Sequence, residues 1–174
     1  MKTLISLTLF LMTLTAWSKG GHLRTVDYVD VQRYVGKWYA ISALPQFFTR
    51  KCIAQTAEYE IINPQTISVL NTCLKVKGQT KIFGQAVVKN AETNAELIVT
   101  FNNFFTRLFR VKGDYNIISL DGEYRYVTVA SEDRKSLWIM SRTPSMPLEV
   151  YNEYVKEARS QKFPTDKLII SRFK

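Results

Sequence analysis

Hydrophobic and polar residues alternate along most of the chain in short runs separated by turn-forming residues. Such alternation is typical of half-buried β-strands, because successive side chains of a strand point to opposite faces. The pattern predicts eight strands, at Gly36–Ala43, Ile53–Ile62, Thr66–Lys75, Thr80–Val88, Ala95–Asn102, Asp114–Ser119, Tyr124–Ala130 and Ser136–Arg142. Eight regular strands with little helix between them indicate an antiparallel barrel or sandwich.

The period changes near the end of the chain. Apolar residues recur at helical spacing from Leu148 to Ala158, preceded by Pro147 and followed by Pro164. Proline suits the first turn of a helix and ends a helix that it follows, so we expect one amphipathic helix here, with its apolar stripe packed on the outside of the sheet. Lys167–Arg172 resembles a short edge strand with charges at both ends.

The first 18 residues have the organisation of a secretory signal peptide. Lys2 gives the positive start, Leu4–Leu14 is mostly apolar, and Ala16 and Ser18 are the small residues that a signal peptidase reads. We therefore expect a signal peptide at 1–18 and a single domain at 19–174. The chain is expected to be exported, to a periplasm, to an outer membrane or out of the cell, and no Cys stands at the cleavage site to accept a lipid anchor.

Export favours a disulfide between the two cysteines, Cys52 and Cys73, because disulfides persist in oxidising compartments. A simple hairpin that pairs Ile62 with Ile67 would place Cys73 opposite Thr56, too far from Cys52 for a bridge. The disulfide therefore requires that the chain entering the second strand curl back, or that the ladder contain a bulge.

The formal charge of +9 has several readings. An anionic lipid surface and general solubility both fit an exported protein. A nucleic-acid partner does not, since no stacking platform is recognisable. The single histidine, His22, lies in the polar lead and completes no Ser-His-Asp or Cys-His arrangement, so we expect no catalysis and neither a metal nor a cofactor.

Three segments resemble the motifs of the lipocalin family. Val31–Tyr39 contains Gly36-Lys37-Trp38, similar to the family's Gly-x-Trp signature; Leu120–Tyr124 resembles its Asp-containing turn between strands six and seven; and Leu137–Pro144 resembles its Arg-bearing end of strand eight. The similarity is greatest to the bacterial, apolipoprotein D-like group, whose members bind fatty acids and lysophospholipids. The chain departs from that group in lacking Thr-Asp-Tyr in the second motif and an anchor Cys.

The resemblance implies an all-β fold, an eight-stranded up-and-down barrel with one C-terminal α-helix outside. It implies a fatty acid or lysophospholipid carried in the barrel, for maintenance of envelope lipids, by a monomer or weak homodimer. Gly36, Trp38, Asp121 and Arg142 become structural motif residues, with Arg142 over the Trp38 ring at the closed end. A scaffold with a filled barrel, which binds partners through its open-end loops, is the alternative.

Strand alternation selects the side chains that would line the cavity and contact the ligand. Trp38 orients the first strand and Arg142 the eighth. Resemblance to the family's Ala-Glu-aromatic stretch, at Ala57–Tyr59, orients the second and third strands, and residue type guides the choice on the others. The predicted lining residues are Ala40, Ser42, Ala57, Tyr59, Val69, Asn71, Phe83, Val99, Phe101, Tyr115, Ile117, Tyr126, Thr128, Trp138 and Met140. Small residues among aromatics leave room for an elongated ligand, and the tyrosine and asparagine side chains can bind its polar head.

Two loops predicted at the open end combine aromatic and basic residues. Apolar rings beside cations are suited to a reversible contact with an anionic membrane. The predicted membrane-contact residues are Phe47, Phe48, Arg50 and Lys51 in the first loop and Phe105, Arg107, Phe109 and Arg110 in the second. The alternatives are that the phenylalanines pack inward as a lid or mediate dimerisation.

Overall fold

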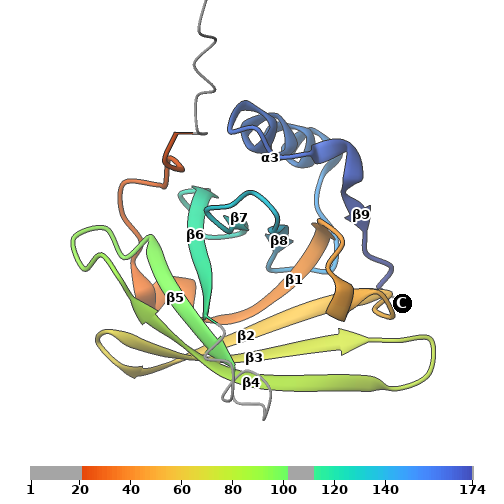
Figure 1. Ribbon diagram of the computed structural model, residues 1–174, viewed down its shortest axis with the longest axis horizontal. Coiled ribbons are helices and arrows are strands. Elements are labelled where there is room, and N and C mark those ends of the chain that lie inside the picture. The colour runs from red at the N-terminus through yellow and green to blue at the C-terminus, as the bar shows by residue number, and fades with distance from the viewer. Residues whose placement is uncertain (1–20, 102–111, 174) are drawn as a thin grey trace, which may run out of the picture.

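The computed structural model describes residues 21–101 and 112–173, so the expected signal peptide at 1–18 lies outside the described residues. Antiparallel strands follow one another around a closed barrel from β2 to β8 and then β1, which pairs back with β2 (Figure 1). Their bounds are β1 (Gly36–Ala43), β2 (Ala54–Asn63), β3 (Thr66–Leu74), β4 (Gln79–Val88), β5 (Glu96–Phe101), β6 (Lys112–Leu120), β7 (Tyr126–Ala130) and β8 (Leu137–Ser141). The predicted eight-stranded barrel is confirmed, with strand ends displaced by at most two residues.

A short helix lies at the closed end, just before β1. In α1 (Val31–Tyr34) the carboxylate of Asp30 caps the first turn by accepting from the backbone N–H groups of Gln32 and Arg33. Upstream, the backbone of Val26 bonds to that of Ile117 on β6. The N-terminal segment therefore lies along the part of β6 that β5 leaves uncovered.

A second layer packs on the outside of the barrel. It consists of α3 (Leu148–Ser160), η2 (Thr165–Lys167) and β9 (Ile169–Ile170), and α3 contacts β6, β7 and β8. The outer core joins Ile118, Leu137, Ala158 and Phe163. The predicted external helix is confirmed, and β9 is the short edge strand, paired with β1. Among the helices that the structure describes, none is both long and apolar enough to cross a bilayer.

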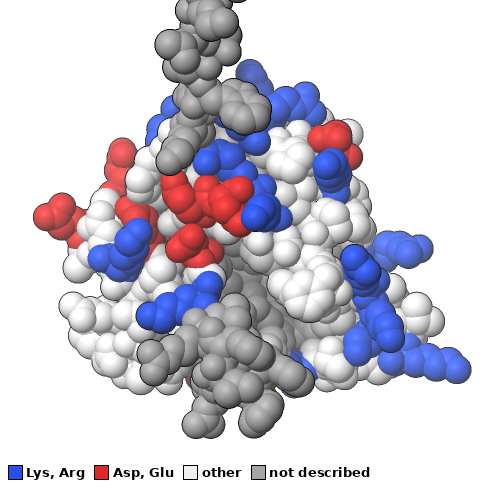
Figure 2. Space-filling model, in the orientation of Figure 1, with Lys and Arg blue, Asp and Glu red and all other residues white. Residues whose placement is uncertain are grey.

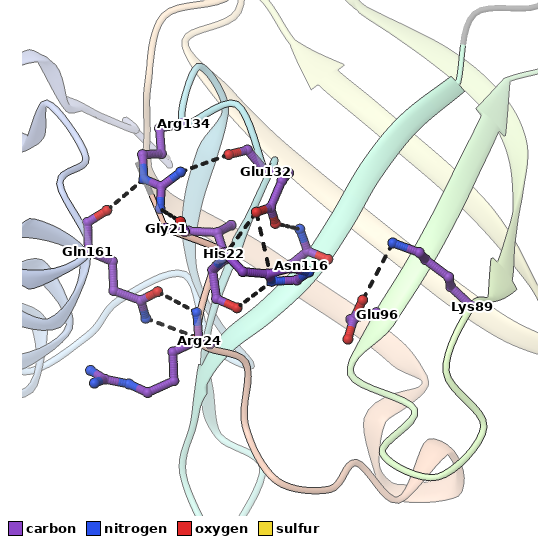
Figure 3. Close-up of polar contacts among 10 residues, drawn as sticks. Gly21, His22, Arg24, Lys89, Glu96, Asn116, Glu132, Arg134 and Gln161 are labelled. Carbon is purple, nitrogen blue, oxygen red and sulfur yellow. Dashed lines mark hydrogen bonds and ion pairs between the residues drawn. The ribbon is translucent and has the colours of Figure 1, made fainter. Parts of the chain in front are cut away.

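Polar contacts attach the N-terminal segment to this outer layer and to the β7–β8 loop (Figure 3). Arg134 donates to the backbone carbonyls of Gly21 and Gln161, and the Gln161 side chain bonds to both backbone groups of Arg24. Glu132 accepts from the backbone N–H of Leu23. These contacts hold three segments that are far apart in the sequence in one arrangement.

Cys52 and Cys73 form the predicted disulfide, with their Cα atoms 5.2 Å apart. The β2–β3 ladder contains a β-bulge between Ile61 and Asn63, which places Cys73 opposite Gln55 rather than Thr56. The chain entering β2 also turns sharply, since the N–H of Cys52 donates to the carbonyl of Thr49. Both ways of bringing the cysteines together are therefore present.

Replacing both cysteines by serine should lower the free energy of unfolding by about 3 kcal/mol. The two cysteines are separated by 21 residues in the sequence, and closing a loop of this size restricts the unfolded chain by roughly that amount. Urea denaturation of the oxidised protein and of the double serine variant measures the difference. A loss below about 0.5 kcal/mol would show that the bridge does not stabilise the barrel.

Candidate functional site

Arg142 joins the segments that meet at the closed end. Its guanidinium carbon lies 3.8 Å from the centre of the Trp38 ring. The same guanidinium donates to the backbone carbonyls of Arg33, Tyr34, Lys37 and Tyr124 at 2.7–3.1 Å. The predicted stacking is confirmed, and four carbonyls from α1, β1 and the β6–β7 turn have a common charged donor.

Gly36 lies beside Arg142 in a backbone conformation that favours glycine. It adopts φ +93°, a conformation that side chains disfavour, and a β-carbon there would lie 3.4 Å from a guanidinium nitrogen of Arg142. The adjacent Trp38 is fully buried, and its indole N–H donates to the carbonyl of Tyr34. The first and third predicted motifs thus meet at one place.

Asp121, the residue of the second motif, organises the β6–β7 turn. Its carboxylate accepts from the backbone N–H groups of Arg125 and Tyr126 and from the Arg125 side chain. Burial alone would raise the pKa of Asp121, but these hydrogen bonds more than offset it, and the pKa lies below its ordinary value. The ionised carboxylate is therefore stabilised by folding.

Asp121→Asn should lower the free energy of unfolding by about 1 to 2 kcal/mol at pH 7, through loss of charge-assisted hydrogen bonds. Because the folded pKa is depressed, this stabilisation is present above the unfolded pKa of about 3.9 and is lost as the pH falls through the folded pKa. Denaturation of wild type and variant at several pH values measures the difference in their free energies of unfolding. This difference should be constant above about pH 5 and become smaller below pH 4. Glu123→Gln, in the same turn, is the control; a difference independent of pH would contradict this role.

Most of the predicted lining residues face the inside of the barrel. Opposite partners in the ladders share a face, and the inner partners belong to one core cluster around Trp38. The predicted residues on this inner wall are Ala40, Ala57, Tyr59, Val69, Asn71, Val99, Phe101, Tyr115, Ile117, Trp138 and Met140. The predicted orientation is confirmed for these eleven, and their contact with a ligand remains a prediction.

Ser42 and Phe83 point outward, contrary to prediction. A bulge between Ala40 and Ser42 reverses the alternation in β1, and the Ser42 hydroxyl accepts a hydrogen bond from Tyr151 on α3. On β4 the inner position belongs to Gly84, where a β-carbon would lie 2.5 Å from the carbonyl oxygen of Thr100. Phe83 is consequently on the outer face and 60% exposed.

Tyr126 and Thr128 also lie on the outer face, so their predicted orientation is wrong by one residue. The inward residues of β7 are Val127 and Val129, which belong to the inner cluster. Tyr126 instead packs edge-on against Tyr154 of α3. The helix buries the outer face of β7 as thoroughly as the barrel buries the inner one, so burial alone does not distinguish the two.

The inner wall is not fully covered by its own side chains. Gly113 pairs with the inward Val99, yet a β-carbon on it would meet no heavy atom of the described residues within 4 Å. Asn71, Tyr115 and Trp138 face inward and are only half-buried. Within the described residues, the inner wall therefore has room beside Gly113, which is itself exposed.

Three tyrosine hydroxyls meet toward the closed end of this wall. The hydroxyl of Tyr115 lies 2.6 Å from that of Tyr34 and 3.0 Å from that of Tyr59. Burial raises the pKa of all three, and that of Tyr59 reaches about 12. Sequence reasoning found Tyr59 and Tyr115 but missed Tyr34, whose position four residues before Trp38 was the available signal.

The first open-end loop carries its aromatic residues on the surface. Phe47 and Phe48 lie in η1 (Phe47–Thr49), pack edge-on against each other, and are 78% and 63% exposed, so they do not form an inward lid. Arg50 and Lys51 are exposed beside them. The second predicted loop, with Phe105, Arg107, Phe109 and Arg110, lies outside the described residues.

No set of three or more His, Cys, Asp and Glu side chains within residues 21–101 and 112–173 is arranged to hold a metal ion. The Asp121 carboxylate organises a turn, and other carboxylates form ion pairs, for example Glu58 with Lys37 and Glu96 with Lys89. In the part of the chain that the structure describes, the site is an apolar inner wall with three tyrosine hydroxyls at one end.

Comparisons with known proteins agree with this architecture. A family model described as a lipocalin-like domain matches residues 29–172. The outer membrane lipoprotein Blc of Escherichia coli K12 is 34% identical over 151 residues, 83% of this chain and 79% of that one. A putative lipocalin of Acanthamoeba polyphaga mimivirus is 33% identical over 149 residues (81% and 83%), and bovine apolipoprotein D is 29% identical over 144 residues (78% and 72%).

Solved structures support the fold alone, because their sequences are distant. Insecticyanin of the tobacco hornworm Manduca sexta superposes with a TM-score of 0.68 at 16% identity, covering 88% of this chain and 86% of that one. Lobster apocrustacyanin A1 superposes with a TM-score of 0.59 at 15% identity, covering 80% and 77%.

Proposed function

Because this chain belongs to the lipocalin family, we propose that it binds a single-chain lipid, a fatty acid or a lysophospholipid, inside its barrel and carries or stores it. The observation that carries the proposal is the apolar inner wall, on which Asn71, Tyr115 and Trp138 face inward without being fully buried. An acyl chain that replaces water at such a wall buries apolar surface. Each buried methylene group contributes about 0.8 kcal/mol to the free energy of binding.

The polar groups of the inner wall fit one end of such a ligand. Apolar pockets with a few polar groups typically use the latter to fix the orientation of a ligand. Here the tyrosine hydroxyls provide those groups, while the wall above them is formed by residues such as Val69, Val99 and Met140. This division suits an amphiphile better than a pure hydrocarbon.

Competition binding tests the proposal. The protein is saturated with N-phenyl-1-naphthylamine, a fluorescent apolar probe, and titrated with oleate and with oleoyl-lysophosphatidylcholine. At least one of the two lipids should displace the probe at a stoichiometry of one per chain. Absence of probe binding and of quenching of the inward Trp138 by either lipid would favour the alternative, a scaffold that acts through its loops.

The exposed open-end loops support a second proposal, contact with an anionic membrane. Phe47, Phe48 and Val76 are each more than 60% exposed. The stretches 44–53 and 74–82 that carry them contain no Asp or Glu, and they hold the cations Arg50, Lys51, Lys75, Lys77 and Lys81. Figure 2 shows basic side chains gathered at the right, where these loops lie in Figure 1. Rings that enter the headgroup layer beside cations would bring the barrel mouth to its lipid source.

Sedimentation with vesicles that contain phosphatidylglycerol tests this contact. The variant Phe47→Ser with Phe48→Ser should bind about tenfold more weakly, because two rings lose their insertion. Phe83→Ser is the matched control, since that ring is 60% exposed, close to the value for Phe48, but lies on the barrel wall. Equal binding by wild type and the double variant would refute the contact.

Lipid binding and membrane contact together suggest where the protein acts. Blc is named an outer membrane lipoprotein, and an exported lipid carrier that touches anionic membranes would serve in an envelope or outside the cell. We propose an envelope role for this chain. Fractionation of cells that express the full chain, with detection of a product cleaved after Ser18, tests it.

A further inference from the structure

Three elements bring one hydroxyl each to the same point toward the closed end of the barrel. Tyr34 comes from α1, Tyr59 from β2 and Tyr115 from β6. The rings of Tyr59 and Tyr115 meet edge-on at 6.1 Å, and the Tyr34 ring lies 5.8 Å from that of Tyr59. We call these three residues the tyrosine cluster.

The hydrogen bonds of the cluster leave one proton without an acceptor. Three phenol groups hold three protons, and the two bonds among them use two. The three hydroxyls make no other hydrogen bond within the described residues. A buried hydroxyl proton is disfavoured unless it is donated, so the cluster is suited to an oxygen atom from a bound molecule.

The cluster keeps this donor capacity over the physiological range. Burial is the main cause that raises the pKa of each phenol, so all three stay protonated at neutral pH. Arg142 lies nearby, and its positive charge acts on Tyr34 and Tyr115. A negative or partly negative oxygen is favoured at this place over a cation.

Tyr115 is the most accessible of the three tyrosines. It faces inward opposite Leu97 and is only half-buried, whereas Tyr34 and Tyr59 are 3% and 6% exposed. A ligand that extends down the barrel therefore meets the Tyr115 side of the cluster first.

On the premise of the proposed function, we propose that the tyrosine cluster binds the carboxyl head of a fatty acid, which enters the barrel head first. The acyl chain then lies along the apolar wall with its terminal methyl group toward the open end. A lysophosphatidylcholine head carries a phosphate and an ammonium group, and burying both charged groups costs more than burying one carboxylate. The site is therefore specific for fatty acids over lysophospholipids.

The first test locates the two ends of bound oleate in the wild-type protein. Oleate is labelled with carbon-13 at the carboxyl carbon or at the terminal methyl carbon, and a soluble paramagnetic agent is added. The carboxyl signal should be protected and the methyl signal broadened. The reverse pattern would overturn the head-first orientation and leave the proposed function standing.

The second test removes the two wall hydroxyls. Tyr59→Phe with Tyr115→Phe should weaken oleate binding at least about tenfold, because a hydrogen bond to a charged group is lost. Binding of N-phenyl-1-naphthylamine, which has no oxygen, should be unchanged and reports that the barrel is intact. Tyr39→Phe is the matched control, since this tyrosine belongs to an outward pair with Ser141.

The outcomes separate the two proposals. Equal oleate affinity of wild type and the double variant overturns the role of the cluster. Tighter binding of oleoyl-lysophosphatidylcholine than of oleate overturns the specificity. Loss of both oleate and the apolar probe in the variant leaves the decision to the labelled-oleate measurement on the wild type. Failure of the wild type to bind either molecule refutes the proposed function itself.

Discussion

Arg142→Ala should lower the free energy of unfolding by about 3 to 4 kcal/mol, a large loss for a single substitution. The side chain donates to four backbone carbonyls and covers the Trp38 ring, so its removal takes a charged donor from partly buried carbonyls such as that of Tyr124 and uncovers a buried ring. Urea denaturation followed by Trp fluorescence measures the change. Arg142→Lys should recover only part of it, because an ammonium group cannot reach the carbonyls as a planar fork does.

Arg50→Ala is the matched control for this prediction. Arg50 is exposed on the open-end loop, and its removal should alter stability by less than about 0.5 kcal/mol. A loss for Arg142→Ala as small as that of the control would mean that the closed end is held by the tyrosines and Trp38 without the guanidinium.

Gly113→Trp should weaken lipid binding by about 100-fold or more. Gly113 faces inward, and a β-carbon there would meet no heavy atom of the described residues within 4 Å, so an indole would occupy volume that the ligand needs. Displacing three or four methylene groups at about 0.8 kcal/mol each corresponds to that factor. The variant should still fold, because no described atom obstructs the added side chain and the backbone is not left-handed.

Asp114→Trp places the same side chain on the opposite face of β6. Asp114 pairs with Ile98 on the outer wall, so lipid affinity should stay within about threefold of wild type. Competition titrations of both variants compare inner and outer positions one residue apart. Equal weakening by the two would contradict an internal binding site.

The strands were predictable because each has one face toward a packed core and ends at turn-forming residues. On β1 and β8 the motif residues Trp38 and Arg142 gave the orientation, and Ala40 and Met140 were placed correctly from it. On β2 the resemblance to the family's Ala-Glu-aromatic stretch placed Ala57 correctly. Ser42 failed because a bulge adds one residue between it and Ala40, and nothing in the residue types marks a bulge.

The remaining errors come from judging orientation by residue size. Phe83 was chosen as the large apolar residue of β4, whereas close packing of Phe101 requires Gly84 to face inward. On β7, α3 covers the outside, so Tyr126 and Thr128 are buried or half-buried although they face outward. Where both faces of a strand are buried, alternation of hydrophobicity disappears and the orientation cannot be read from it.

Two of the three residues of the tyrosine cluster were predicted from the sequence. Tyr59 was placed by the resemblance on the second strand and Tyr115 by residue type, whereas Tyr34 belongs to a one-turn helix whose position depends on the Asp30 cap and on contacts with Arg142. Such tertiary contacts have no periodic signal in the sequence.

Native mass spectrometry of the protein mixed with oleate tests the central claim, an internal lipid site, most directly. Wild type and Asp114→Trp should each gain the mass of one oleate per chain, and Gly113→Trp should remain unliganded. An oleate adduct of equal abundance on all three proteins, or on none, would contradict lipid binding inside the barrel.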